Sequence, residues 1–166
     1  LIADDVGVGK TIEAGLILRE LMDRGEVSKA AVLCPPHLCD QWRSELREHF
    51  NIEASILTPQ TVRALERSVP SGTLFDFYKF VIVSLDYIKS DEHRLNFISA
   101  APDFIIVDEA HTCASAGSGR QQRFSLLSEL AKKESRSLLL LTATPHSGNE
   151  KGFYNLLSLL NPKFKL

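Results

Sequence analysis

Short apolar runs alternate with longer amphipathic segments along this chain of 166 residues. Runs in which hydrophobic residues follow one another without polar alternation predict buried strands, and they cover residues 1–3, 30–34, 54–57, 80–83, 104–107 and 137–141. The segments between them predict helices over residues 10–23, 40–50, 92–99, 121–133 and 149–160. Such strands are typical of a mainly parallel sheet covered by helices on both faces, so the pattern predicts a three-layer α/β/α fold.

Two of the predicted helices carry a defined apolar face. In the second helix, Trp42, Leu46 and Phe50 recur every four residues, and we expect Trp42 to be a core residue. The last helix has an apolar stripe formed by Phe153, Leu156, Leu157 and Leu160. Residues 68–77 and 114–119 are rich in small and turn-forming residues and predict loops, and no internal repeat or domain boundary is visible.

Composition narrows the class of protein. Hydrophobic residues make up 44% and charged residues 24% of the chain, which favours a packed core over disorder. The formal net charge is −2, so any binding of nucleic acid needs a local basic patch. No signal peptide is visible, and no apolar run approaches the roughly 20 residues that span a bilayer. The three cysteines lack paired CxxC spacing, which argues against a disulfide framework or a zinc site and favours the cytoplasm.

Residues with distinctive chemistry follow the predicted strands. They lie at positions 7–11, 35–42, 84, 108–111 and 142–147. In open parallel sheets, ligands bind beyond the carboxyl ends of the strands. The sequence therefore predicts a ligand site along one edge of the sheet.

A glycine-rich segment follows the first apolar run. Gly7 and Gly9 permit backbone torsions that are closed to other residues, and a helix that begins near Lys10 directs its first amides toward an anion. We expect Lys10 to reach the β- and γ-phosphates of a nucleotide and the Thr11 hydroxyl to coordinate magnesium. Asp4 stands where the general pattern GxxxxGK[ST] has glycine.

An acidic motif, Asp108-Glu109-Ala110-His111, follows the fifth apolar run. Asp108 can hold magnesium through water, and Glu109 can orient or deprotonate an attacking water. For His111 two interpretations stay open, a structural role or a link between the nucleotide site and neighbouring elements. Together with the glycine-rich segment, the motif predicts hydrolysis of a nucleoside triphosphate, with Glu109, Lys10 and Asp108 as the catalytic residues.

Five segments resemble, in order and spacing, the motifs of the Swi/Snf family of superfamily-two helicase-like ATPases. They are residues 4–14, residues 34–36 with 41–42, residues 83–87, residues 107–111 and residues 141–145. The motif of this family has Asp-Glu before Gly-x-Gly-Lys-Thr, which accounts for Asp4. Residues 146–149 are similar to the bacterial branch that includes the RNA-polymerase-associated RapA-like proteins.

The resemblance implies a RecA-like P-loop fold and an ATPase that moves along double-stranded DNA. The residues expected to hold ATP are Asp4, Gly7, Val8, Gly9, Lys10, Thr11 and Ile12, with magnesium on Thr11 and Asp108. The residues expected to contact nucleic acid or to couple to it are Pro35, Pro36, Gln41, Ser84, His111, Thr142 and Thr144. The chain begins at Leu1 and lacks the later motifs of the family. We therefore interpret residues 1–166 as the N-terminal ATP-binding domain, without its upstream segment and without the second RecA-like domain that supplies arginine fingers.

Several alternatives stay open. The parent protein can be an ATPase that acts on RNA or single-stranded nucleic acid, or the piece can be a nucleotide- or partner-binding module without turnover. Thr144 either relays the nucleotide state or only ends its strand. Arg120 and Arg123 either contact DNA or form a solvated basic face.

Overall fold

A computed structural model describes residues 1–3, 9–113, 118–143 and 150–164 of the chain. Five strands form one parallel sheet in the order β2-β3-β1-β4-β5. Their bounds are β1 Ala30–Cys34, β2 Ser55–Leu57, β3 Phe80–Ser84, β4 Phe104–Val107 and β5 Ser137–Leu140. Ile2 forms a parallel bridge with Leu141, so the segment that leads to the glycine-rich loop lies beside the chain that leaves β5.

Helices connect the strands in the described residues. The α-helices are α1 Lys10–Asp23, α2 Cys39–Phe50, α3 Val62–Ser68, α4 Leu74–Phe77, α5 Asp91–Ala100, α6 Ser118–Ala131 and α7 Glu150–Leu160. The 3-10 turns are η1 Pro36–Leu38, η2 Tyr87–Lys89, η3 Ala110–Cys113 and η4 Pro162–Phe164. Among these described helices, none is long and apolar enough to span a bilayer.

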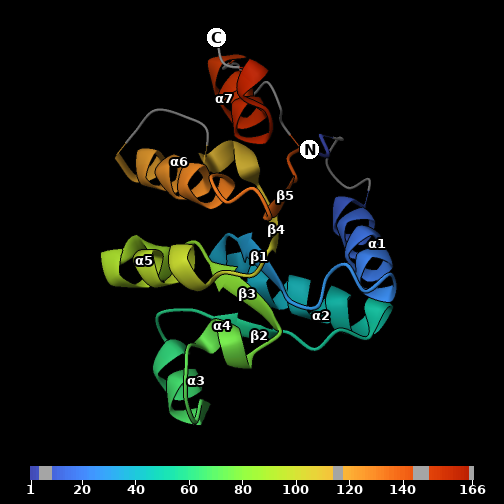
Figure 1. Cartoon of the computed structure of the whole chain (residues 1–166), viewed down its shortest axis with the longest axis vertical. Helices are drawn as coiled ribbons and strands as arrows, with labels where there is room; N and C mark the ends of the chain where they lie inside the picture. The colour runs from blue at the N-terminus through green and yellow to red at the C-terminus, as the bar shows by residue number, and fades with distance from the viewer. Residues whose placement is uncertain (4–8, 114–117, 144–149, 165–166) are drawn as a thin grey trace.

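The two faces of the sheet are covered by different helices (Figure 1). Helices α1 and α2 pack on one face, where Trp42 shares a buried cluster with Val32 of β1. Helices α5, α6 and α7 pack on the other face, where Phe97 and Leu127 share a cluster with Leu33 of the same strand. Because both faces are buried, the strands are apolar without alternation. The predicted three-layer α/β/α fold with a parallel sheet is confirmed.

The apolar face predicted for the second helix is confirmed, and the stripe predicted for the last helix is partly wrong. Trp42, Leu46 and Phe50 are 1%, 2% and 8% exposed. In α7, Leu156 is buried, whereas Leu160 is 38% exposed. Leu160 is the final residue of α7, and Leu159 instead packs against the core.

The loop predicted over residues 68–77 is also wrong in part. Leu74–Phe77 forms the short helix α4, because the Thr73 hydroxyl accepts from the Asp76 amide while the Asp76 carboxylate accepts from the Thr73 amide. Burial of Leu74 and Phe75 holds this turn on the core. In the second predicted loop, residues 114–117 lie outside the described residues, and residues 118–119 belong to α6.

Candidate nucleotide-binding site

The parallel register brings the residues that follow the strands to one edge of the sheet. Strands β1 and β3 end together at the pair Cys34 and Ser84. The Asp108 amide, directly after β4, donates to a carbonyl of β1 at 2.9 Å. The Ala110 amide donates to the carbonyl of Leu141 at 2.9 Å. The acidic motif therefore lies between the ends of β1 and β5, at the carboxyl edge of the sheet where the sequence predicts a ligand site.

Helix α1 begins after Gly9, whose φ of 92° and ψ of 27° lie in the left-handed region. A Cβ added at Gly9 would meet no atom of the described residues within 4 Å, and the left-handed torsion favours glycine. The first amides of a helix have no acceptor within the helix, and this start can receive an anion. Its first turn consists of the half-buried residues Lys10, Thr11, Ile12 and Glu13. The predicted nucleotide-binding residues outside the described part are Asp4, Gly7 and Val8.

The Asp108 carboxylate is held by one donor on each oxygen. Its Oδ1 accepts from the Glu109 amide, and its Oδ2 accepts from the indole Nε1 of Trp42, each at 2.8 Å. The prediction that Trp42 is a core residue is confirmed, but its hydrogen bond to the acidic motif was missed. The available signal was chemical, because a buried indole N–H usually needs an acceptor.

Glu109, His111 and Thr142 form a connected group. The Glu109 backbone has a φ of 50°, a left-handed torsion that is uncommon outside glycine and clusters at functional sites. His111 Nδ1 lies 3.1 Å from Glu109 Oε2 and 3.1 Å from the hydroxyl of the buried Thr142. The His111 ring therefore joins the acidic motif to the residue that follows the bridge at Leu141, and its role as a link to the nucleotide site stays a prediction.

Two thiols lie close to the acidic motif. Cys34 Sγ and Cys39 Sγ are 3.7 Å apart, and both cysteines are buried and free. The hydrogen bond with Cys39, together with burial, raises the pKa of the Cys34 thiol far above its usual range, while the same bond lowers the pKa of Cys39. Burial also raises the pKa of Cys113 to about 11. Cys34 and Cys113 are therefore neutral thiols in the core.

The residues predicted to meet nucleic acid separate into exposed and buried positions. Pro36 and Gln41 are exposed, and Pro35 is half-buried. Ser84 is fully buried, and its hydroxyl accepts from the Asp86 amide at 3.1 Å. Ser84 therefore shapes the turn after β3 and offers no exposed side chain for a direct contact, and its expected role in coupling to nucleic acid stays a prediction. Thr144 lies outside the described residues, as do residues 146–149.

A hollow of about 240 Å³ lies between the end of β3 and α6. The residues that line it are Leu85, Ile88, Lys89, Gln122 and Arg123. Lys89 forms an ion pair with Asp86, and its ammonium is mainly exposed. Arg123 is half-buried and lines this hollow. The hollow combines apolar walls with two cationic side chains.

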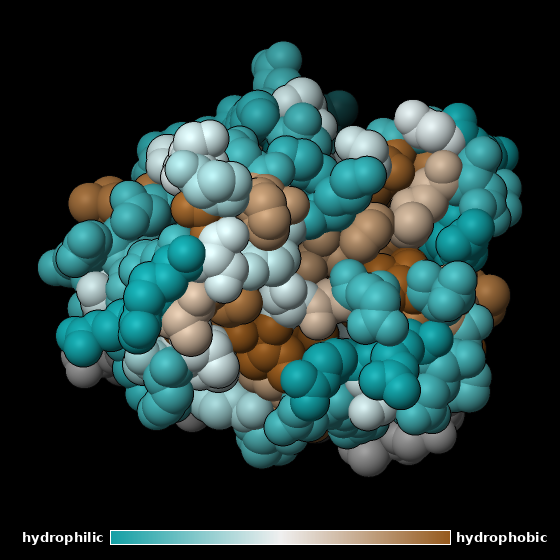
Figure 2. All heavy atoms as spheres, turned by 90° about the horizontal axis from the view of Figure 1, so that it is seen from below, coloured by the Kyte–Doolittle hydropathy of each residue, from teal (hydrophilic) through white to brown (hydrophobic). Residues whose placement is uncertain are grey.

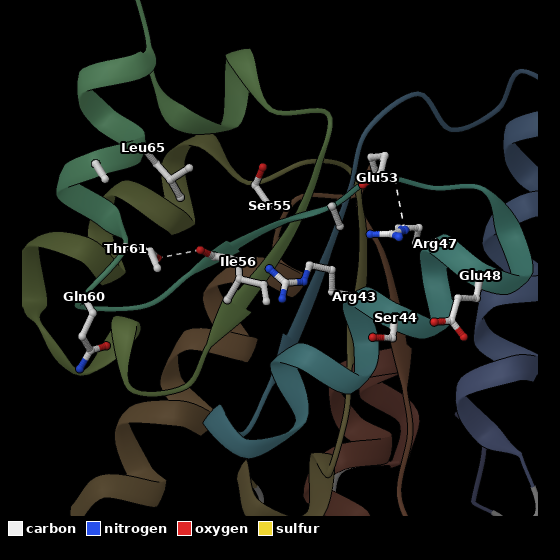
Figure 3. Close-up of a pocket in the computed structure, with 12 residues that line it drawn as sticks. Arg43, Ser44, Arg47, Glu48, Glu53, Ser55, Ile56, Gln60, Thr61 and Leu65 are labelled. Carbon is white, nitrogen blue, oxygen red and sulfur yellow. Dashed lines mark hydrogen bonds and ion pairs between the residues drawn. The ribbon is translucent and has the colours of Figure 1, made fainter.

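A second hollow, of about 820 Å³, lies between α2, β2 and α3 (Figure 3). Its cations have acidic partners, since Arg43 pairs with Asp40 at 2.7 Å and Arg47 with Glu53 at 3.9 Å. The molecule seen from the side of α3 is mainly hydrophilic, with hydrophobic side chains visible in recessed areas (Figure 2). None of the residues that line this hollow belongs to the glycine-rich segment or the acidic motif.

The parallel sheet covered by helices on both faces, the helix that begins after Gly9 and the acidic strand end together define a RecA-like domain. Residues 1–165 match the SNF2-related domain family, and the chain belongs to that family.

Relatives and a solved structure agree with this assignment. The chain is 34% identical to the RNA polymerase-associated protein RapA of Yersinia pestis (strain Pestoides F). The matched segment has 163 residues and covers 98% of the chain. RapA of Yersinia pseudotuberculosis serotype O:1b (strain IP 31758) matches with the same identity and coverage. The chain spans 16% of the length of both relatives. The Sulfolobus solfataricus SWI2/SNF2 ATPase core in complex with dsDNA has the same fold, with a TM-score of 0.75 and 20% identity over 97% of this chain and 31% of that chain.

Proposed function

We propose that this chain is the N-terminal ATP-binding domain of a DNA-dependent ATPase that moves along double-stranded DNA. The observation that carries the proposal is the Asp108–Glu109 pair at the carboxyl edge of the sheet, in a chain of the SNF2-related family. The left-handed backbone of Gly9, directly before α1, supports an anion site at the start of this helix. We place the protein in the cytoplasm, where three free thiols stay reduced.

The residues present fit ATP and magnesium. A carboxylate has about four acceptor positions, and the two hydrogen bonds to Asp108 leave others for the water ligands of a cation. Thr11 supplies a hydroxyl and Lys10 an ammonium from the first turn of α1. Magnesium, when bound, neutralises charge on the phosphates. Lys10 orients the phosphates by charge-assisted hydrogen bonds.

Glu109 is the general base of the proposed reaction. Its carboxylate takes a proton from the attacking water, and His111 Nδ1 contacts that carboxylate at 3.1 Å. Because His111 also contacts Thr142, a displacement of the segment after β5 changes the position of the base. We propose that His111, Thr142 and Thr144 relay the nucleotide state in this way.

Double-stranded DNA is the proposed partner, and a second RecA-like domain of the same protein completes the site. The exposed Pro36 and Gln41 flank the carboxyl edge, together with Arg123 and with Lys89, which is paired with Asp86. In a chain of net charge −2, we propose that Arg123 is the main local cation for the DNA backbone. A cationic finger from the opposite domain contributes on the order of 10³–10⁵ in rate for enzymes of this chemistry. Residues 1–166 alone should therefore bind nucleotide but hydrolyse it very slowly.

The first experiment compares the ATPase rate of the full-length protein with double-stranded DNA, single-stranded DNA and RNA over a series of salt concentrations. We expect the largest stimulation by double-stranded DNA, and the stimulation should weaken as salt rises because phosphate contacts release counterions. Equal or larger stimulation by RNA would favour the alternative helicase. No turnover with any nucleic acid, combined with normal nucleotide binding, would favour the module without turnover.

The second experiment tests the residues. Glu109→Gln in the full-length protein should keep ATP binding and lower the turnover about 10²–10⁴-fold, because the amide has no basic oxygen. Lys10→Ala should instead weaken ATP binding by about 1.5–3 kcal/mol for each charged hydrogen bond lost. Glu134→Gln is the matched control, since Glu134 is exposed beyond α6. Near-normal turnover in Glu109→Gln would show that the base is another residue.

A further inference from the structure

The indole of Trp42 is bonded to the acidic motif across a long stretch of sequence. Its Nε1 donates to Asp108 Oδ2 at 2.8 Å, and the two residues are 66 positions apart. Trp42 is 1% exposed and lies in the first turn of α2, inside the cluster between α1, α2 and the sheet. The indole therefore has two separable parts, an apolar ring that fills the core and an N–H that faces a carboxylate.

Packing of the core alone does not require the indole N–H of Trp42. Phe50, on the same face of α2, fills its part of the core with a ring that has no polar atom. A tryptophan at position 42 adds a donor, and that donor meets the carboxylate that directly follows β4. A hydrogen bond to a charged acceptor is stronger and more directional than one between neutral groups.

The bond decides how the carboxylate is oriented. The Glu109 amide holds Oδ1, and Trp42 holds Oδ2, so the carboxyl plane is fixed by two donors from different elements. With only the Glu109 amide, the carboxyl group could rotate about its terminal torsion, which is broad for aspartate. A ligand that needs a given oxygen at a given place would then lose part of its binding free energy to the ordering of that group.

We infer that Trp42 is a positioning residue for the metal-binding carboxylate of Asp108 and sets the magnesium dependence of nucleotide binding. The inference rests on the proposed function, in which Asp108 holds magnesium through water. Trp42 itself touches neither the nucleotide nor the metal in this assignment. It acts through the orientation of one oxygen of Asp108.

The test measures the affinity of the full-length protein for a non-hydrolysable ATP analogue, with magnesium and with EDTA. In Trp42→Phe the affinity in EDTA should stay near that of the wild type, while the gain in affinity on adding magnesium should fall about 10-fold, the expected loss for one hydrogen bond to a charged group. A second variant carries benzothienylalanine at position 42, in which sulfur replaces the N–H and the ring size is kept. It should show the same loss.

Two further variants separate the possible outcomes. Phe50→Leu removes ring volume from the same face of α2 without changing a residue bonded to Asp108. The increase in affinity for the ATP analogue on adding magnesium should be the same in this variant as in the wild type. Asp108→Asn should itself reduce the magnesium gain, and failure to do so would overturn the proposed role of Asp108. If Asp108→Asn reduces the gain but the benzothienylalanine protein keeps it, the N–H has no positioning role and our inference is wrong.

Discussion

The packing of α1 against α2 makes Gly15→Ala an informative substitution. Gly15 lies inside α1 (Lys10–Asp23) and is buried. A Cβ added at Gly15 would overlap Cε2 of Phe50 and would lie 2.6 Å from Cζ and 2.7 Å from Cδ2. Phe50 is 8% exposed and ends α2, so its ring is enclosed on most sides. The two helices approach each other closely because position 15 has no side chain.

Two opposing effects determine how Gly15→Ala changes the free energy of unfolding. In an isolated helix, alanine is more favourable than glycine by about 1 kcal/mol. Against this, carbon atoms pack at about 3.5–4.0 Å, so the ring or the whole of α1 must move by more than about 1 Å, and overpacking costs about 1–3 kcal/mol. A ring with three atoms inside the contact distance points to the upper part of that range. We expect a net loss of about 1–2 kcal/mol in the free energy of unfolding.

Urea unfolding, followed by the fluorescence of Trp42, the single tryptophan of the chain, measures this loss. The double variant Gly15→Ala/Phe50→Leu supplies the control, because leucine removes ring atoms from the overlap. Its loss should be at least about 1 kcal/mol smaller than the sum of the two single losses. A higher stability of Gly15→Ala, as helix propensity alone predicts, would refute the packing of α1 on Phe50.

Three other predictions concern single contacts. Arg136→Met should lower the free energy of unfolding by about 2–4 kcal/mol in urea titrations, because the buried guanidinium donates to the carbonyls of Ala101, Pro102 and Leu130. The control is Arg63→Met at an exposed position, which should change the free energy of unfolding by less than about 0.5 kcal/mol. Equal effects of the two substitutions would contradict the structural role of the buried Arg136. At position 109, where φ is 50°, Glu109→Gly should be more stable than Glu109→Ala by about 1 kcal/mol in thermal unfolding, and the reverse order would exclude the left-handed backbone. Hydrogen bonds from Thr73 lower the pKa of Asp76, so this carboxylate adds stability above its unfolded-state pKa and the contribution is lost as pH falls through the lower folded-state pKa. In Thr73→Ala an NMR titration should find the pKa of Asp76 raised toward its ordinary value, and an unchanged pKa would rule out the capping box.

Much of the fold follows from local sequence patterns. The apolar runs at residues 80–83 and 104–107 became β3 and β4, because strands buried on both faces must be apolar throughout. The placement of Asp108 and Glu109 at the carboxyl edge also follows, since the ends of parallel strands meet at one side of a sheet. The family itself could be recognised from motif order, and the match over residues 1–165 agrees with it.

Other features depended on the tertiary structure. The sequence did not reveal the order β2-β3-β1-β4-β5, the helix α4, or the burial of Ser84. The bond between Trp42 and Asp108 and the near-contact of Gly15 with Phe50 join residues that local periodicity cannot relate. Both contacts arise from the angle and distance at which helices cross the sheet and each other, and these are set by the packing of all the side chains between them. The residue types at the site could therefore be identified from sequence, whereas the partners that orient them are decided only when the chain is folded.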